Sequence, residues 1–357
     1  RATLVETAPQ TIERMLVSPS GDSVIALGAY DTVSGSPDKM LIRASAIGTF
    51  ADWELPLDPE EDSTVFDYRL TAGSRILTGF KTRGGVLVNT DKASYLMRAD
   101  PTEIYSIGDP VALENSPVGP NAAFDVDGTG YWFAKDKIMN YDGVQQELPC
   151  DVWGYVFDND AAAEGKTPGF NRDQGDKVYG YYNDKGDEIT FLYPSLNSDE
   201  NDRYLCFNKG QRVWYYGAVA RTAMSTGGIA YSLPYGSAPT GELFIHEGVP
   251  DADGALMNEY IESWDMQTAE GAASTHFSMY IPDFKRWTGT MRMQLKTKDR
   301  PNQPTYSTAT YDMEDDTIEQ GVHVCGRQIA IRFGSIELGS SWRMAPGTLY
   351  GQPDGMG

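Results

Sequence analysis

The segment from residue 171 to residue 221 limits the fold of this chain more than any other part of it. It reads NRDQGDKVYGYYNDKGDEITFLYPSLNSDENDRYLCFNKGQRVWYYGAVAR. Apolar and aromatic runs at residues 177–182, 188–193 and 203–208 alternate with turns rich in Asp, Asn, Gly and Ser, and a fourth run follows at 212–216. Runs this short, rich in Tyr, Val and Phe and bounded by turn residues, are typical of β-strands. The segment therefore predicts a meander of short antiparallel strands.

Similar meanders recur along the chain. One is predicted at residues 65–99 and another at residues 122–141, which contain the turn Asp127-Gly128. Equivalent turns lie about 45 to 60 residues apart, which is in the range of β-propeller blades. We therefore predict an all-β, β-propeller-like array of four-stranded antiparallel meanders with long loops. An array of β-sandwiches is the alternative that composition leaves open.

Charge divides the chain into two parts. The whole chain has 29 basic and 51 acidic residues, for a net charge of −22. Residues 1–275 hold 20 Lys and Arg against 42 Asp and Glu, whereas residues 276–357 hold nine of each. We predict that residues 1–275 form acidic propeller blades. Residues 276–357 are expected to form a C-terminal β-rich segment that completes the propeller or contacts neighbouring subunits, with a long exposed loop at the polar, Pro-bearing residues 299–321.

A body this acidic does not bind nucleic acid through the phosphates as an ordinary DNA-binding protein does. Solubility is the common reason for such a charge. A more specific interpretation is a surface along which DNA passes without being bound. Cys150, Cys206 and Cys325 are odd in number and far apart, which indicates neither a disulfide framework nor a zinc site. The sequence has no apolar run of about 18 residues, so we predict no membrane span.

Three local patterns resemble functional sites but have simpler explanations. DVDGTGYWF at residues 125–133 and DADG at residues 251–254 place carboxylates at alternating positions, as calcium loops do. Each supplies too few oxygen ligands for calcium, so an Asp-Gly turn is favoured for both. His246 and Glu247 are adjacent, so a strand would point them to opposite faces. Common catalytic and phosphate-binding motifs are missing from the sequence. We therefore predict no catalytic, metal-binding or cofactor-binding residue, no cofactor, and a chain that is not an enzyme.

Basic residues in this acidic chain are the candidates for subunit contacts. Lys285 and Arg286 are adjacent, and three more basic residues follow between positions 296 and 300. A solvated strand face is one interpretation, and contact with an acidic neighbouring subunit is an equally good one. Arg221, Arg327 and Arg343 are further candidates for contacts between strands or subunits. Aromatic residues of the strands are expected to pack between blades or cap a core, among them Tyr131, Trp132, Trp214 and Tyr215.

Several segments, in order along most of the chain, carry a family likeness. They are RGGVLVNTDKASYLM (83–97), VGPNAAFDVDGTGYWFAKDKIMNYDG (118–143), NDRYLCFNKGQRVWYYGAVARTAM (201–224), FIHEGVPDADGALMNEYIES (244–263), YIPDF (280–284), CGRQIAIRFGS (325–335) and WRM (342–344). With these segments the chain resembles the tail-hub proteins of short-tailed bacteriophages, also described as tail nozzle or packaged-DNA stabilisation proteins. The acidic loop at residues 54–62 departs from that pattern.

The resemblance implies a structural protein of the virion, located in the phage tail. It implies a β-propeller-like subunit of a homo-oligomeric ring, commonly a hexamer, below the portal and adaptor proteins. Such a ring extends the DNA channel, retains packaged DNA until ejection, and supports tail fibres, spikes or a needle-like plug. Packaged DNA would pass through the lumen without sequence-specific binding, and an acidic lumen is compatible with that passage because it repels phosphates.

A glycan-binding or glycan-processing β-propeller, in a tail or in a secreted protein, is the alternative function. Paired carboxylates are too abundant in this sequence to single out a glycosidase pair, so a divergent glycosidase stays open. Carboxylates and arginines that converge at the centre of the propeller would favour glycan processing. A large exposed aromatic groove would favour glycan or receptor binding.

Overall fold

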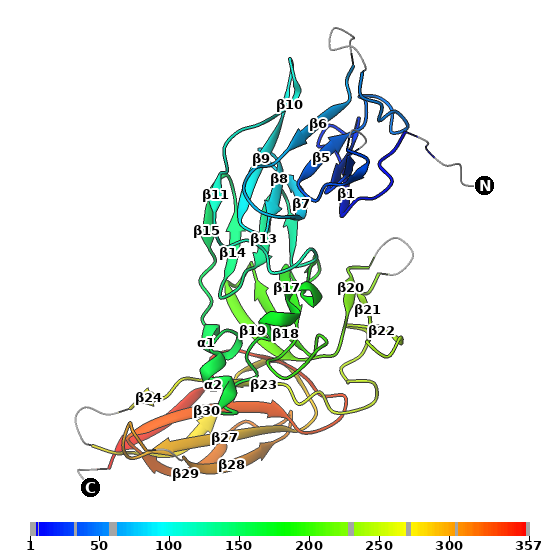
Figure 1. The fold of residues 1–357 in the computed structure, drawn as a ribbon. Helices are drawn as coiled ribbons and strands as arrows, with labels where there is room; N and C mark the ends of the chain where they lie inside the picture. Colours follow the sequence, from blue (N-terminus) through cyan, green and yellow to red (C-terminus); the bar gives the residue numbers. More distant parts are fainter. Residues whose placement is uncertain are drawn as a thin grey trace. The chain divides into compact units, whose positions relative to one another are not determined.

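The structure is a computed structural model that describes residues 5, 7–31, 34–56, 63–227, 232–268, 273–303 and 306–354. It divides into two compact units, unit 1 (Arg1–His246) and unit 2 (Glu247–Gly357), each with its own sheets (Figure 1). The predicted boundary lay at residue 275. The structure places it earlier because β23 (Tyr260–Glu262) and β24 (Met266–Gln267) pair with β30 (Gln328–Ser335) of unit 2.

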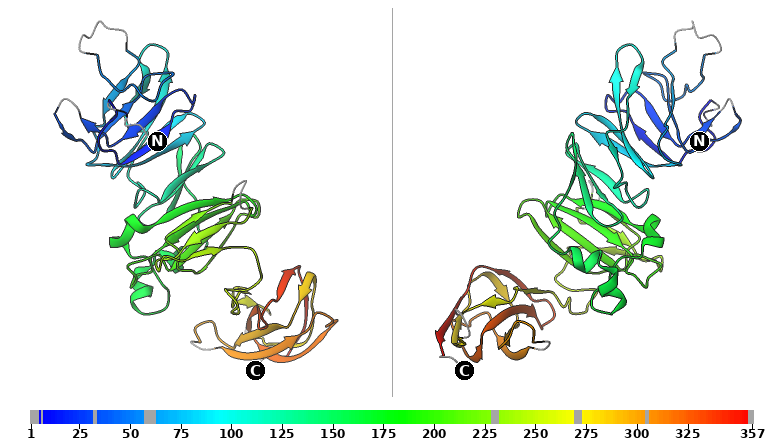
Figure 2. Two further views of the ribbon diagram at one scale, coloured as in Figure 1. Left: turned by 90° about the vertical axis from the view of Figure 1, so that its right-hand side faces the viewer. Right: turned by 60° about the vertical axis from the view of Figure 1, so that its left-hand side comes forward.

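Within the described residues, unit 1 is a succession of antiparallel meanders, which follow one another from blue to green in Figures 1 and 2. The first two sheets are β1 (Arg14–Val17), β2 (Val24–Leu27), β5 (Leu41–Ala44) and β6 (Phe66–Arg69), then β7 (Ile76–Thr82), β8 (Gly85–Thr90), β9 (Ala93–Asp100) and β10 (Ile104–Ile107), with β11 (Ala112–Leu113) paired to β9. The next two are β12 (Ala123–Val126), β13 (Thr129–Phe133), β14 (Ile138–Tyr141) and β15 (Gln145–Glu147), then β16 (Tyr179–Asn183), β17 (Glu188–Tyr193), β18 (Arg203–Asn208) and β19 (Val213–Ala218). A three-stranded sheet follows, with β20 (Ala223–Ser225), β21 (Tyr235–Ser237) and β22 (Leu243–Ile245).

Short elements complete unit 1. They are the two-stranded ribbon β3 (Tyr30–Asp31) and β4 (Ser36–Pro37), the helices α1 (Trp153–Val156) and α2 (Asn159–Ala163), and the 3-10 helix η1 (Arg172–Lys177). Among the described residues, no helix has the length and apolar character needed to cross a membrane.

These meanders pack as the blades of a propeller do, which confirms the predicted all-β, β-propeller-like array. The first strands of consecutive sheets contact one another, from β1 to β7, β7 to β12, β12 to β16 and β16 to β20. The meander predicted at residues 171–221 is the sheet β16 to β19. The strand predicted at residues 65–70 belongs to the first sheet as β6, rather than to the second.

Alternate residues of one strand enter two different cores, which shows how the sheets stack. On β8, Val86 and Val88 belong to a cluster shared with the first sheet, whereas Leu87 belongs to a cluster shared with the third. On β13, Trp132 faces the second sheet, and Phe133 faces the fourth. Both faces of these strands are therefore buried, so their sequences read as continuous apolar runs without clear alternation.

The aromatic residues singled out from the sequence differ in burial. Trp132 is fully buried, and its indole N–H donates to the Asn115 carbonyl at 2.6 Å. Tyr131 is buried in the cluster between the third and fourth sheets. On the outer strand β19, Trp214 packs on Phe207 with ring centroids 4.8 Å apart, and Tyr215 is exposed. The predicted packing between blades is therefore confirmed for Tyr131 and Trp132 of β13, and it holds less well for Trp214 and Tyr215 of β19.

Burial raises the pKa of Tyr204 to about 12, and the neighbouring Cys206 and Glu188 add to the rise. In the unfolded chain the pKa of a tyrosine is about 10. Between about pH 10 and 12 the folded state therefore keeps a proton that the unfolded state loses, so this contribution to stability is complete below pH 10 and declines above it. We expect the free energy of unfolding of Tyr204→Phe, measured with urea between about pH 10 and 12, to fall less steeply with pH than that of the parent protein. Equal slopes for the two proteins would contradict this assignment.

Unit 2 encloses one core between two sheets, which are coloured yellow to red in Figure 1. One sheet has the order β23, β30, β27 (Met291–Lys298) and β28 (Ser307–Met313), and the other has β29 (Gln320–Gly326), β25 (Thr275–Ile281) and β32 (Thr348–Pro353). Met291, Met293 and Leu295 of β27 face the core, and the residues between them are half-buried, as the alternation of this strand predicts. The predicted exposed loop at residues 299–321 contains β28, whose Thr and Tyr residues pair with β27.

Candidate functional site

A two-stranded ribbon of unit 2 brings together three of the predicted interface residues. β26 (Phe284–Thr288) pairs with β31 (Ser341–Met344), and Arg286 lies opposite Arg343. The register shifts between Phe284 and Arg286, which is a β-bulge with Lys285 as the extra residue. Lys285 and Arg286 are therefore both exposed, while Phe284 and Trp287 on either side pack against the core of unit 2. We call Lys285, Arg286 and Arg343 the basic ribbon.

Four other basic residues of unit 2, Arg292, Lys296, Lys298 and Arg332, have carboxylate partners, which the basic ribbon lacks among the described residues. Arg292 pairs with Asp312 at 2.7 Å, and Lys296 and Lys298 pair with Glu262 and Asp265 at 2.7 and 3.0 Å. No carboxylate among the described residues forms an ion pair with the basic ribbon. Two arginines directly opposite each other repel, at a cost of about 0.2–1 kcal/mol. Such a surface favours an acidic partner that would neutralise it.

The other two predicted interface residues lie elsewhere. The Arg221 Nε donates to His246 Nε2 at 2.9 Å, and its guanidinium lies 4.0 Å from the centroid of the Phe244 ring. Burial and then the charge of Arg221 lower the pKa of His246. Arg327 follows β29, and its backbone N–H donates to the Lys298 carbonyl at 3.0 Å. The Arg221 side chain is thus engaged within unit 1, whereas the Arg327 Nε is buried without a hydrogen-bond partner among the described residues. An interface role for any of the five stays a prediction.

A second group of polar residues gathers where the first strands of the blades begin. The Arg75 Nη2, just before β7, lies 3.2 Å from the Asp176 Oδ1, just before β16. Arg14, the first residue of β1, donates from Nη1 to the carbonyl of Pro120, ahead of β12. The Tyr179 hydroxyl, at the start of β16, donates to the Met224 carbonyl of β20 at 3.1 Å. The first contact joins the second and fourth sheets, the next joins the first and third, and the last joins the consecutive fourth and fifth sheets.

Burial lowers the pKa of Arg14, and the proximity of Tyr179 partly offsets that effect. Backbones also approach closely here, since a Cβ on Gly119 would lie 2.5 Å from the carbonyl oxygen of Gly175. Guanidinium, carboxylate and hydroxyl groups in one place can bind an anion or the hydroxyls of a sugar. Sequence reasoning missed this group because its members are far apart in the chain. The sequence feature that could have indicated this group is that its members lie at or just before the first strand of a meander.

The sequence patterns that resembled metal sites are turns. Asp127 and Gly128 have φ values of 53° and 81°, as expected for the Asp-Gly turn between β12 and β13. Asp251 accepts a hydrogen bond from the Gly254 N–H at 2.8 Å within its own turn. In the part of the chain that the structure describes, no group of three His, Cys, Asp or Glu side chains could hold a metal ion.

No protein-family model and no curated protein matches this chain. Solved structures do match it, among them three of an exo-β-1,3-galactanase from Phanerochaete chrysosporium. The complex with galactose is 8% identical with a TM-score of 0.29. Two structures with β-1,3-galactotriose are 10% and 9% identical with TM-scores of 0.30 and 0.26. Each alignment covers 94% of this chain and 80% of the galactanase chain.

These matches correct one prediction. These galactanase structures stand against the prediction that the chain is not an enzyme, and we withdraw that prediction without assigning an activity in its place. At this identity and TM-score the likeness assigns neither a reaction nor a site residue to the chain. The architecture of unit 1 rests on its own strand pairing, as described above.

Proposed function

We propose that this chain is a structural subunit of a phage tail and forms the ring of the tail hub, or nozzle. The observation that carries the proposal is the opposite charge of unit 1 as a whole and of the basic ribbon of unit 2. Residues 1–246 hold 20 basic and 35 acidic residues, whereas the basic ribbon of unit 2 lacks a described carboxylate partner. When an acidic surface of one subunit meets the basic surface of the next, the contact is head to tail, and such contacts form a ring when the rotation between subunits closes.

The resemblance to tail-hub proteins supports the location and the partners of this ring. Its order of segments runs through both units, from residues 83–97 in unit 1 to residues 342–344 in unit 2. Portal and adaptor proteins, and fibres, spikes or a needle, are the neighbours that the resemblance implies. The excess of carboxylates suits a channel through which packaged DNA slides, because phosphates are repelled and not held.

The full chain is expected to associate into a closed oligomer, a hexamer by the resemblance, when its mass is measured by analytical ultracentrifugation at low ionic strength. Since the contacts are electrostatic, raising the ionic strength to about 1 M, where the Debye length is about 3 Å, should shift the oligomer toward monomer. Negative-stain electron microscopy should show rings. A chain that stays monomeric at low ionic strength, without ring-shaped particles, would overturn the proposal.

A glycan-binding or glycan-processing propeller is the second candidate function. Arg14, Arg75, Asp176 and Tyr179 favour it, because arginines, a carboxylate and a hydroxyl lie near the starts of the first strands of the blades. Release of reducing ends from oligosaccharides by the purified chain, lost in Asp176→Asn, would support glycan processing. Ring assembly without such release would favour the tail hub.

A further inference from the structure

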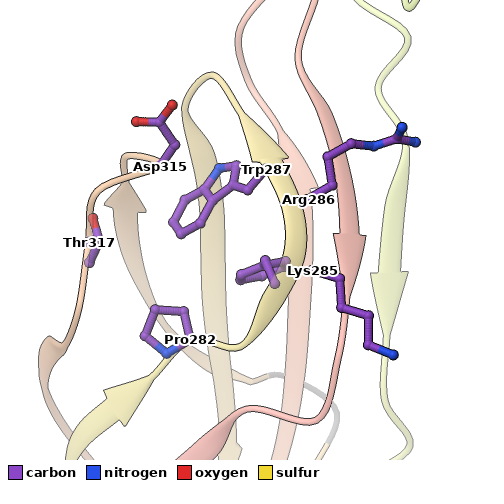
Figure 3. A pocket seen from close by; sticks show the side chains of 7 residues that line it. Pro282, Lys285, Arg286, Trp287, Asp315 and Thr317 are labelled. Carbon is purple, nitrogen blue, oxygen red and sulfur yellow. The ribbon is translucent and has the colours of Figure 1, made fainter.

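A hollow of about 470 Å³ opens in unit 2 beside β26. Pro282, Phe284 and Trp287 line it from the segment around β26, and Asp315 and Thr317 line it from the turn between β28 and β29. Figure 3 shows Trp287 reaching toward the side of Asp315 and Thr317. Lys285 and Arg286, which also border the hollow, extend to the opposite side of β26 (Figure 3). The bulge that creates the basic ribbon thus also turns Trp287 toward this hollow.

The aromatic wall of the hollow is held in place before any ligand arrives. The indole N–H of Trp287 donates to the Gly289 carbonyl at 2.8 Å. Its ring packs on Phe284, with ring centroids 4.8 Å apart. The hydrogen bond and the packing on Phe284 hold the Trp287 ring in one orientation. Such a rigid flat surface lowers the entropic cost of binding.

The polar wall keeps unused hydrogen-bonding capacity. The hydroxyl of Thr317 accepts from the Glu314 N–H at 3.0 Å, which leaves its own proton free to donate. Asp315 is exposed and forms no hydrogen bond or ion pair through its side chain with a described residue, so both carboxylate oxygens can accept. The hollow therefore offers an acceptor pair and a donor opposite an aromatic ring.

A pyranose ring matches this combination. Its C–H groups carry a slight positive charge and pack on the negative face of an aromatic ring, while its hydroxyls both donate and accept. The hollow also has the size of small-ligand sites, which are roughly 300–1,000 Å³. We propose that this hollow binds a neutral saccharide, with Trp287 as the stacking surface and Asp315 and Thr317 as hydrogen-bonding partners. The site lies in unit 2, and the proposal rests on neither function above.

The test is an NMR titration of the full chain with maltotriose, cellotriose, chitotriose and β-1,3-galactotriose, observed at the indole N–H signals. Trp287→Phe assigns the Trp287 signal by its disappearance. We expect at least one trisaccharide to shift that signal with an affinity of about millimolar, as is common for shallow sites. Asp315→Asn should weaken binding about tenfold, which corresponds to the loss of one charge-assisted hydrogen bond.

Asp316→Asn is the matched control, because Asp316 is the next residue of the same turn and does not line the hollow. It should bind like the parent chain. If no saccharide of the panel shifts the Trp287 signal, or if Asp315→Asn binds as well as Asp316→Asn, the proposal is overturned. If Trp287→Phe does not fold, the comparison of the two aspartate variants decides alone, since both side chains are exposed. Hydrolysis is not measured, so the result is separate from the second candidate function.

Discussion

Phe133→Ala is expected to lower the free energy of unfolding of unit 1 by about 3–5 kcal/mol, the usual cost of deleting a fully buried aromatic ring. Phe133 has no exposed surface and lies in the core between the third and fourth sheets. Its ring contacts four others, with centroids 5.0 Å from Phe157, 4.9 Å from Phe170 and 5.8 Å from both Phe191 and Tyr193. Removal of the ring leaves a cavity that rigid strands on both sides cannot fill by collapse.

The measurement is urea unfolding of the purified chain, followed by far-UV circular dichroism. Phe50→Ala is the matched control, since the same substitution is made at a side chain that is 71% exposed. We expect that control to change stability by less than about 0.5 kcal/mol. The core of unit 2 shares no residue with the cluster around Phe133, so a transition of unit 2 should not move. Equal stability of the two variants would contradict the assignment of Phe133 to the core between blades.

Reversal of the basic ribbon, Lys285→Glu with Arg286→Glu and Arg343→Glu, is expected to abolish ring formation. Close charge pairs across an interface couple with about 1.5–7 kcal/mol, and reversal replaces attraction by repulsion, so the dissociation constant should rise by at least about 100-fold. All three ribbon residues are exposed, and none has an ion pair with a described carboxylate to lose, so unit 2 should fold as before. The variant should not gain stability from losing the repulsion between Arg286 and Arg343. Its two glutamates at these positions also lie opposite each other and repel.

The control must change net charge equally without touching the ribbon. Arg69→Glu with Arg83→Glu and Lys166→Glu does so, at side chains of unit 1 that are 63%, 70% and 70% exposed. Each loses a surface ion pair, typically worth less than about 1 kcal/mol. Sedimentation at low ionic strength should show monomer for the ribbon variant and the oligomer for this control. If both variants form the oligomer, the basic ribbon does not contribute to assembly, which would contradict its role in the subunit contact.

The fold class follows from local patterns alone. Short aromatic runs between Asp, Asn, Gly and Ser turns recur at the spacing of blades, and β16 to β19 form where the 171–221 segment predicts them. In β27 the alternation of apolar and polar residues likewise matches the side of the strand that meets the core. Turn chemistry and period-two alternation are properties of neighbouring residues, so one sequence suffices to read them.

The sites depended on contacts between distant residues. Lys285 and Arg286 were visible as adjacent charges, but only the bulge in β26 and the pairing with β31 place them on one face with Arg343. Arg75 and Asp176 are about a hundred residues apart and meet only because the first strands of the blades converge. In the same way, β23 and β24 have acidic surroundings like those of unit 1, and their pairing with β30 decides that they belong to unit 2. The chain alone therefore determined strands, turns and charge, whereas the tertiary structure decided which strands pair. The reason is physical: the free energy that selects a partner strand comes from burying side chains against residues far along the chain, and no local pattern records that choice.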